Sequence, residues 1–228
     1  MPGVGGMKML SDPVKARIAQ RVAQELPDKA VVNLGVGIPT LVTGYVPKDK
    51  TIFVQSENGL LGVGPLADKK EADVDLIDAS RNKVTLINGG SIFDSAASFA
   101  MIRGGHLDVA IIGALEVSER GDLANWSVPS KGVYGVGGAM DLVCGCKKVI
   151  VAIQHVGKDG KSKILRECTL PLTAVGVVDT VVTEFAVFKF IGKKMYLTEH
   201  TSDIGVEKLR TITEGQFVVS GDMKIRKI

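Results

Sequence analysis

Val109-Ala110-Ile111-Ile112 is a short run in which every residue is apolar. A strand with apolar side chains on both faces is typical of the middle of a parallel sheet, because helices cover both faces of such a sheet. Further β-type runs precede and follow it, at residues 30–34, 51–54, 84–87, 149–153 and 194–198. Segments with helical spacing of apolar residues alternate with several of these runs, at residues 13–26, 39–45, 94–103 and 204–212. The sequence therefore predicts an α/β fold: an open, mostly parallel sheet with flanking helices and a smaller β-rich C-terminal extension.

Capping residues mark the first and the last of these helices. Ser11-Asp12-Pro13 combines a capping side chain with a proline in the first helical turn. Ser202-Asp203 predicts the start of the last helix by the same reasoning.

The chain has 228 residues, of which 45% are hydrophobic, and can bury one sizeable core. It contains no internal repeat, low-complexity tract or linker, so we expect a single domain over residues 11–228. Residues 1–10 include Gly3, Gly5 and Gly6, and we expect them to form a flexible leader.

Composition argues against several classes of protein. The net charge is only +3, and no basic stripe with interleaved aromatic residues suggests nucleic-acid binding. No run of about 18 apolar residues predicts a membrane span, and residues 1–10 do not resemble a secretory signal. The three cysteines fit no disulfide framework, so we expect reduced thiols and a cytoplasmic location.

The tetrapeptide Ser56-Glu57-Asn58-Gly59 places a carboxylate directly after the strand at 51–54. Glu57 is either a solvated turn residue or, if partly desolvated, a nucleophile or acid/base beside a cavity. Glycine-rich segments at 35–37, 58–64 and 88–90 each follow a predicted strand. Ligands of parallel sheets bind at the carboxyl ends of strands, so we expect these three segments to be turns that gather at one edge.

A second glycine-rich segment, residues 135–141, lies within the long loop predicted between residues 113 and 143. Small residues leave backbone N–H groups unobstructed, as an oxyanion hole requires, but the same composition also suits a flexible loop.

Other motifs in the chain are incomplete. Gly35-Val36-Gly37 begins like a dinucleotide fingerprint, but Pro39 and Thr40 break the pattern. Cys144-x-Cys146, with His155 and Cys168, has no common zinc spacing, so no metal site is predicted. No Gly-x-Ser-x-Gly elbow is present, which argues against an α/β-hydrolase.

Several segments together resemble the B (β) subunit of family I coenzyme A transferases of the 3-oxoacid/acetoacetate type. The similar segments cover nearly the whole chain after the leader: 33–40 (NLGVGIPT), 56–59 (SENG), 62–65 (GVGP), 98–106 (SFAMIRGGH), 121–126 (GDLANW), 137–143 (GGAMDLV) and 168–173 (CTLPLT).

The resemblance implies covalent catalysis by Glu57. This carboxylate would attack an acyl-CoA thioester, form an acyl-glutamyl anhydride and then carry CoA as a glutamyl thioester, with ping-pong kinetics. The backbone N–H groups of Gly138 and Ala139 match the family's oxyanion loop, and Asn58 would orient the nucleophile. No cofactor or metal is implied, because coenzyme A is a substrate.

The resemblance also implies a partner, an A (α) subunit, in an A2B2 assembly. CoA would pass from succinyl-CoA, acetyl-CoA or butyryl-CoA to a 3-oxoacid such as acetoacetate or a related short-chain acid. Two alternatives remain open: an acyl-CoA hydrolase that uses the same Glu57, and a non-catalytic ligand-binding module on the same sheet.

Overall fold

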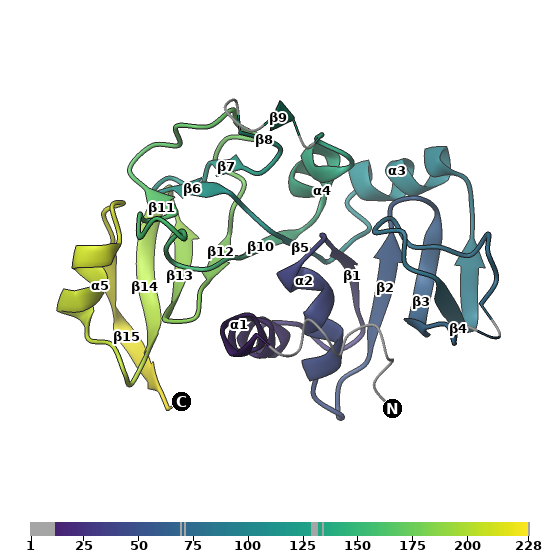
Figure 1. Cartoon of the computed structure of the whole chain (residues 1–228), viewed down its shortest axis with the longest axis horizontal. Helices are drawn as coiled ribbons and strands as arrows, with labels where there is room; N and C mark the ends of the chain where they lie inside the picture. Colours follow the sequence, from purple (N-terminus) through teal and green to yellow (C-terminus); the bar gives the residue numbers. More distant parts are fainter. Residues whose placement is uncertain (1–11, 69, 71, 129–131, 134, 228) are drawn as a thin grey trace.

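The computed structural model describes residues 12–68, 70, 72–128, 132–133 and 135–227. The predicted leader at residues 1–10 lies outside the described residues. Most strands join one ten-stranded sheet, in the order β15-β14-β13-β12-β10-β5-β1-β2-β3-β4 (Figure 1). Its strands are β1 Ala30–Leu34, β2 Ile52–Ser56, β3 Leu60–Leu66, β4 Val84–Ile92, β5 Val109–Ile112, β10 Lys148–Ala152, β12 Thr180–Val182, β13 Ala186–Ile191, β14 Lys194–Thr201 and β15 Val218–Arg226.

Five shorter strands lie outside this sheet. They are β6 Glu116–Ser118, β7 Leu123–Ala124 and β11 Ile164–Leu165, which pair with one another, and the hairpin strands β8 Ser127–Val128 and β9 Gly132–Val133.

Strand β5 occupies the middle of the sheet, as its apolar sequence predicts. It pairs in parallel with β1 on one side and with β10 on the other, and all four of its residues are buried. Strands β2 and β12 extend this parallel centre. Antiparallel pairs follow at both ends, β2–β3–β4 at one and β12–β13–β14 at the other, and the predicted C-terminal extension therefore continues the same sheet.

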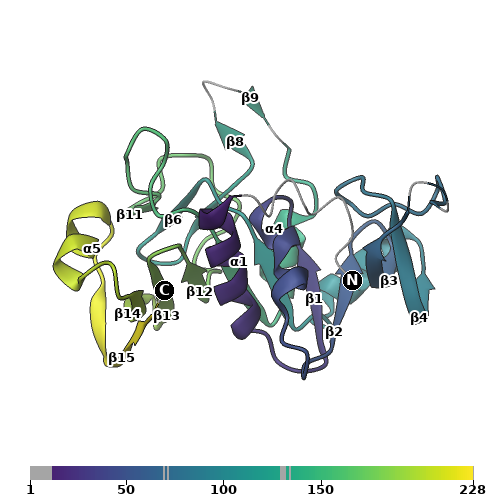
Figure 2. The same ribbon diagram turned by 60° about the horizontal axis from the view of Figure 1, so that its bottom comes forward.

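Helices cover both faces of the parallel centre (Figure 2). These helices are α1 Pro13–Gln24 and α2 Ile38–Leu41, with the 3₁₀ turn η1 Val42–Tyr45, on one face, and α3 Ser95–Arg103 and α4 Ala139–Gly145 on the other. Helix α5 Val206–Ile212 lies at the C-terminal end of the sheet, beside β14 and β15 (Figure 1). Val109 and Ile111 of β5 pack in one cluster with α1, whereas Ala110 packs with Ile102 of α3 and Leu142 of α4. Alternate residues of one strand thus reach opposite helix layers, which explains why the whole strand is apolar.

The first helix begins as predicted, and the last one does not. Asp12 caps α1, and its carboxylate accepts hydrogen bonds from the N–H groups of Val14 and Lys15. The predicted cap of α5 at Ser202-Asp203 is wrong, because the helix starts at Val206 after Gly205 and has no side-chain cap. Asp203 instead accepts hydrogen bonds from Thr201 and Arg17.

Two of the three predicted glycine turns need correction: Asn58 and Gly59 do form a turn, but the rest of the segment 58–64 does not, and neither does the segment 88–90. Residues 60–64 lie within β3 and residues 88–90 within β4, and these strands form an antiparallel pair beyond β2. The pairing shifts register between Leu61 and Val63, and Gly62 and Gly89 have φ angles of 80° and 85°. These glycines therefore lie in β-bulges, where one strand carries an extra residue. They do not form connections between strands.

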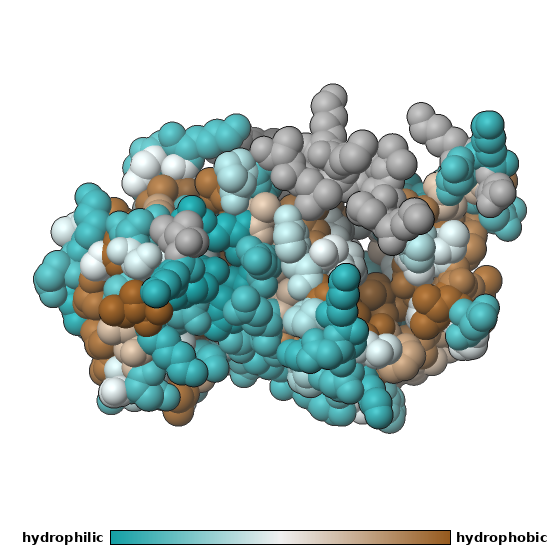
Figure 3. Space-filling model, turned by 90° about the horizontal axis from the view of Figure 1, so that it is seen from below, coloured by the Kyte–Doolittle hydropathy of each residue, from teal (hydrophilic) through white to brown (hydrophobic). Residues whose placement is uncertain are grey.

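The β4 end of the molecule exposes apolar side chains. Phe53, Ile87 and Ile92 are 36%, 39% and 68% exposed, and the view from below shows hydrophobic surface at this end (Figure 3). None of the helices in the described ranges is both long enough and apolar enough to cross a bilayer.

Candidate active site

Glu57 lies in the tight connection between β2 and β3, half-buried at the carboxyl end of β2. Gly59 makes this connection possible, because its φ of 121° suits glycine and a Cβ there would collide with the carbonyl oxygen of Phe93. The Gly59 carbonyl also accepts a hydrogen bond from the N–H of Phe93 at 2.9 Å. The turn that carries Glu57 is therefore fixed from both sides.

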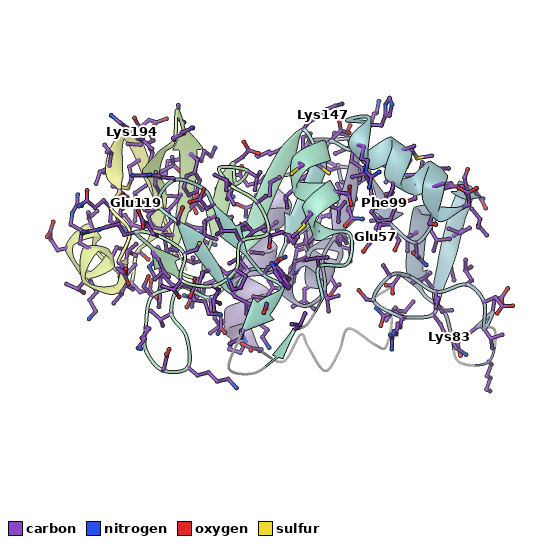
Figure 4. All side chains as sticks on the ribbon, turned by 90° about the horizontal axis from the view of Figure 1, so that it is seen from above. Glu57, Lys83, Phe99, Glu119, Lys147 and Lys194 are labelled. Carbon is purple, nitrogen blue, oxygen red and sulfur yellow. The ribbon has the colours of Figure 1, made fainter. Side chains whose placement is uncertain are left out.

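Gly138 contacts Glu57 across the site, although the two residues lie 81 positions apart in the chain. A Cβ added to Gly138 would lie 3.2 Å from Cγ of Glu57 and 3.3 Å from Cζ of Phe99. Figure 4 shows Phe99, a residue of α3, next to Glu57. The structure thus brings together the predicted nucleophile and the predicted oxyanion loop, and Gly138 fits because it has no side chain.

The two predicted oxyanion donors differ in availability. The N–H of Ala139 donates to the carbonyl oxygen of Val136 at 3.0 Å, so it is already in use. The N–H of Gly138 has no acceptor among the residues that the structure describes. Of the two, only Ala139 has an N–H acceptor among the described residues, so Gly138 is the better candidate for an oxyanion donor.

Asn33 is a site residue that the sequence interpretation missed. Its Nδ2 lies 3.2 Å from Oε2 of Glu57 and 2.7 Å from Oε1 of Gln55, and its side chain is only 2% exposed. The signal was present in the sequence, because Asn33 is the single polar residue of the strand Ala30–Leu34. A buried amide in an apolar strand needs a hydrogen-bond partner, and that partner points to the site.

The side chain of Asn58, which was expected to orient Glu57, makes its described hydrogen bond to another segment. The exposed side chain donates from Nδ2 to the carbonyl oxygen of Ile77 at 2.7 Å. On the other side of Glu57, Oγ of Ser56 accepts the N–H of Ala79 at 2.9 Å. Both neighbours of Glu57 therefore bind the segment 77–79, while Glu57 itself lies against Gly138 at Cγ and accepts a hydrogen bond from Asn33 at Oε2.

The other candidate groups do not form a second reactive centre. Burial raises the pKa of Cys146 and of Cys168 to about 12, so both thiols are poor nucleophiles at neutral pH. His155 is fully buried between Thr183 and Thr213. No group of three or more His, Cys, Asp or Glu side chains that could hold a metal ion occurs in the part of the chain described.

Comparison with known proteins identifies the family. Residues 15–211 match the family model described as "Coenzyme A transferase". The chain belongs to the coenzyme A transferase family. It is a CoA-transferase enzyme chain, and its α/β sheet is the fold expected from the sequence.

Two curated relatives of this CoA transferase span nearly its full length. It is 51% identical over 213 residues to the beta subunit of the acetate CoA-transferase of Escherichia coli K12, covering 93% of this chain and 97% of the relative. It is 50% identical over 206 residues to the B subunit of a probable succinyl-CoA:3-ketoacid coenzyme A transferase of Bacillus subtilis, covering 90% and 95%.

A solved structure shares the fold of this CoA transferase. An acyl-CoA transferase from Escherichia coli O157:H7, determined as a thioester complex with CoA, superposes with a TM-score of 0.73 at 21% identity. The match covers 93% of this chain, which spans only 43% of the length of that chain.

Proposed function

We propose that this CoA transferase is the B subunit of a two-subunit enzyme that moves CoA between short-chain carboxylic acids through Glu57. The donors would be succinyl-CoA, acetyl-CoA or butyryl-CoA, and the acceptor a 3-oxoacid such as acetoacetate or a related acid. The names of the two curated relatives support this substrate class. The observation that carries the proposal is the position of Glu57 against Gly138 and Asn33.

In the first half-reaction, a carboxylate oxygen of Glu57 attacks the thioester carbonyl carbon of the acyl-CoA. The carbon–sulfur bond breaks, CoA leaves as its thiolate, and an acyl-glutamyl anhydride forms. The thiolate then attacks the side-chain carbonyl carbon of Glu57. The anhydride bond to that carbon breaks, the product acid leaves as a carboxylate, and CoA is held as a glutamyl thioester.

In the second half-reaction, the acceptor carboxylate attacks the glutamyl thioester, and the same steps run in reverse. Each step exchanges a carboxylate and a thiolate as leaving groups, so no net proton transfer and no oxidant is required. Water would hydrolyse both the anhydride and the thioester, so the working site has to exclude it.

The protein groups around Glu57 suit this chemistry. We assign to the N–H of Gly138 the stabilisation of a tetrahedral oxyanion, a contribution of about 2.7–4 kcal/mol in other acyl-transfer sites; the close approach of Gly138 to Glu57 supports this role. Ala139 would contribute only if its N–H left Val136, so we assign it the lesser role. The side-chain N–H of Asn33 holds Oε2 of Glu57 and leaves Oε1 for attack.

We further propose an A-subunit partner and an A2B2 assembly. Both curated relatives are named as subunits, and in the acyl-CoA transferase structure more than half of the chain lies beyond the matched part. The apolar surface at the β4 end supports association with another chain. The three cysteines are free thiols, which supports a location in the cytoplasm.

Substitution of the proposed nucleophile tests this function. In the complex reconstituted with its A subunit, we expect Glu57→Gln to reduce CoA transfer from succinyl-CoA to acetoacetate to background, because an amide cannot form the anhydride. The control is Glu207→Gln, an exposed position on α5, which should transfer CoA at the wild-type rate. Wild-type turnover by Glu57→Gln would refute the assignment, and robust transfer by this chain alone would refute the need for a partner.

A further inference from the structure

Three buried polar side chains form a continuous hydrogen-bonded chain that ends at Glu57. Asn33 lies on β1, Gln55 on β2 and Ser98 on α3, and their side chains are 2%, 1% and 0% exposed. Asn33 and Gln55 are paired directly across the parallel strands β1 and β2. These three hydrogen-bonded side chains therefore connect the centre of the sheet with helix α3. We call the set of three the polar relay.

The hydrogen bonds of the polar relay have a defined direction. An ionised Glu57 can only accept, so Asn33 must turn its N–H group toward Oε2, at 3.2 Å. The same Nδ2 then donates to Oε1 of Gln55 at 2.7 Å, with a weaker contact to the Gln55 carbonyl oxygen at 3.3 Å.

At the other end of the polar relay, a donor again faces an acceptor. Because Oε1 of Gln55 faces Asn33, its Nε2 faces away and donates to Oγ of Ser98 at 2.8 Å. The hydroxyl of Ser98 can both donate and accept, so it anchors the amide of Gln55 in place, while the carboxylate of Glu57 sets the direction of the hydrogen bonds. The anchored amide of Gln55 in turn holds the amide of Asn33 beside Glu57.

We propose that Gln55 and Ser98 are positioning residues that act through Asn33 to hold one oxygen of Glu57 and leave the other for attack. The proposal rests on the proposed role of Glu57 as nucleophile. Neither Gln55 nor Ser98 needs to touch the substrate, because each acts on the carboxylate through the next member of the relay.

Helix α3 gives this arrangement a second point of control. Ser98 anchors the relay on one side of Glu57, and the adjacent Phe99 packs against Gly138 on the other side. One turn of α3 therefore sets both the orientation of the nucleophile and its distance from the oxyanion donor. A set of polar groups that served only core stability would not have to end at the reactive carboxylate.

Removal of the Ser98 hydroxyl is the most selective change. Ser98→Ala leaves Nε2 of Gln55 buried without an acceptor, so the amide is no longer held in one orientation. We expect the rate of glutamyl-CoA formation at saturating acyl-CoA to fall about tenfold, the size of one lost buried hydrogen bond, with KM unchanged. Asn33→Ala should reduce the rate further, because it removes the direct contact.

A double-mutant cycle in the complex with the A subunit tests the relay. Formation of the CoA adduct from acetyl-CoA is followed by rapid quenching and mass spectrometry for wild type, Ser98→Ala, Asn33→Ala and the double variant. If Ser98 acts through Asn33, its substitution should have no further effect in the Asn33→Ala background. Ser118→Ala, an equally buried serine in β6 outside the relay, should form the adduct at the wild-type rate.

A pair of isosteric variants separates the effect of the hydroxyl group at position 98 from the effect of side-chain packing. Ser98→Thr and Ser98→Val fill the same volume, so a faster rate for Thr than for Val supports the relay even if both are slowed by crowding. Equal rates for this pair, a wild-type rate for Ser98→Ala, or full additivity in the cycle would overturn the positioning role. If wild type forms no adduct on Glu57, the proposed function fails and this proposal falls with it.

Discussion

At the scale of single residues, Gly138 sets how closely the proposed oxyanion loop approaches Glu57. A methyl group at this position would lie 3.2 Å from Cγ of Glu57 and 3.3 Å from Cζ of Phe99, so one of them would have to move by a few tenths of an ångström. Because a displacement of 1 Å can cost about a hundredfold in rate, we expect Gly138→Ala to lower kcat about tenfold and Gly138→Val to lower it more.

The measurement is steady-state CoA transfer by the complex, together with the thermal midpoint of each variant. Gly44→Ala is the matched control, because a Cβ there would meet nothing within 4 Å. The φ of Gly138 is −85°, which any residue tolerates, so the substitution should leave the midpoint nearly unchanged. Wild-type kcat for Gly138→Val would show that this contact does not govern catalysis.

The sequence pointed to the proposed nucleophile better than to the residues around it. Glu57 and Gly138 stand in unusual local patterns, and both lie in the site. Asn33 was missed because its importance depends on a neighbouring strand, which no local pattern contains. The direction of the Asn58 side chain could not be predicted either, because it depends on the segment at Ile77, 19 positions further along the chain.

At the scale of elements, the contact between α3 and α4 fixes the position of Phe99, which lies on α3, relative to Gly138, which directly precedes α4. Gly145, the last residue of α4, packs so closely that a Cβ there would collide with the carbonyl oxygen of Ile102 in α3. The ion pair between Arg103 and Asp141 also links the two helices, but Arg103 is 68% exposed, so this pair contributes little.

We therefore expect Gly145→Ala to lower the free energy of unfolding by about 2 kcal/mol, the usual cost of overpacking. Helix propensity alone would favour alanine by about 1 kcal/mol, so the sign of the change separates the two effects. Urea unfolding checks this prediction, with Gly205→Ala as the control at an uncrowded helix end. A stabilised Gly145→Ala protein would contradict the close packing of α3 on α4.

The local sequence predicted those elements whose residue pattern follows directly from their own surroundings, such as burial between two helix layers or a capped helix start. Strand β5 is apolar because helices lie on both sides, and α1 begins at a capping aspartate. Residues 60–64 of β3 and 88–90 of β4 were not predicted as strand, because their glycines are also typical of turns. Only the pairing of β3 with β4, with its register shifts, shows that they belong to bulged strands. The predicted cap of α5 is wrong, and Asp203 instead binds a residue distant in sequence, Arg17 of α1.

At the scale of the whole molecule, His155 makes stability depend on pH. Burial lowers its pKa from 6.5 to about 4, so the unfolded chain binds a proton at this residue more readily than the folded one between these values. The stabilising effect of the neutral ring is complete above pH 6.5 and is lost as the pH falls toward 4. The total is about 3 kcal/mol, since one pKa unit corresponds to about 1.4 kcal/mol.

Urea unfolding at pH 7.5 and pH 5.0 measures this effect. The loss of unfolding free energy between the two pH values should be smaller in His155→Gln than in wild type. The nearby Glu184 accepts the N–H of His155, and burial raises the pKa of its carboxyl, which acts in the opposite direction. The comparison between wild type and variant cancels that contribution, and an identical pH dependence in both proteins would contradict the assignment to His155.

The proposed mechanism requires a covalent bond between CoA and Glu57. The most direct measurement is mass spectrometry of the complex, with its A subunit, after incubation with acetyl-CoA in the absence of an acceptor acid. We predict a CoA adduct on the peptide that contains Glu57, which disappears when acetoacetate is added and never forms in Glu57→Gln. An active complex that carries no adduct, or carries it on another residue, would contradict covalent catalysis by Glu57.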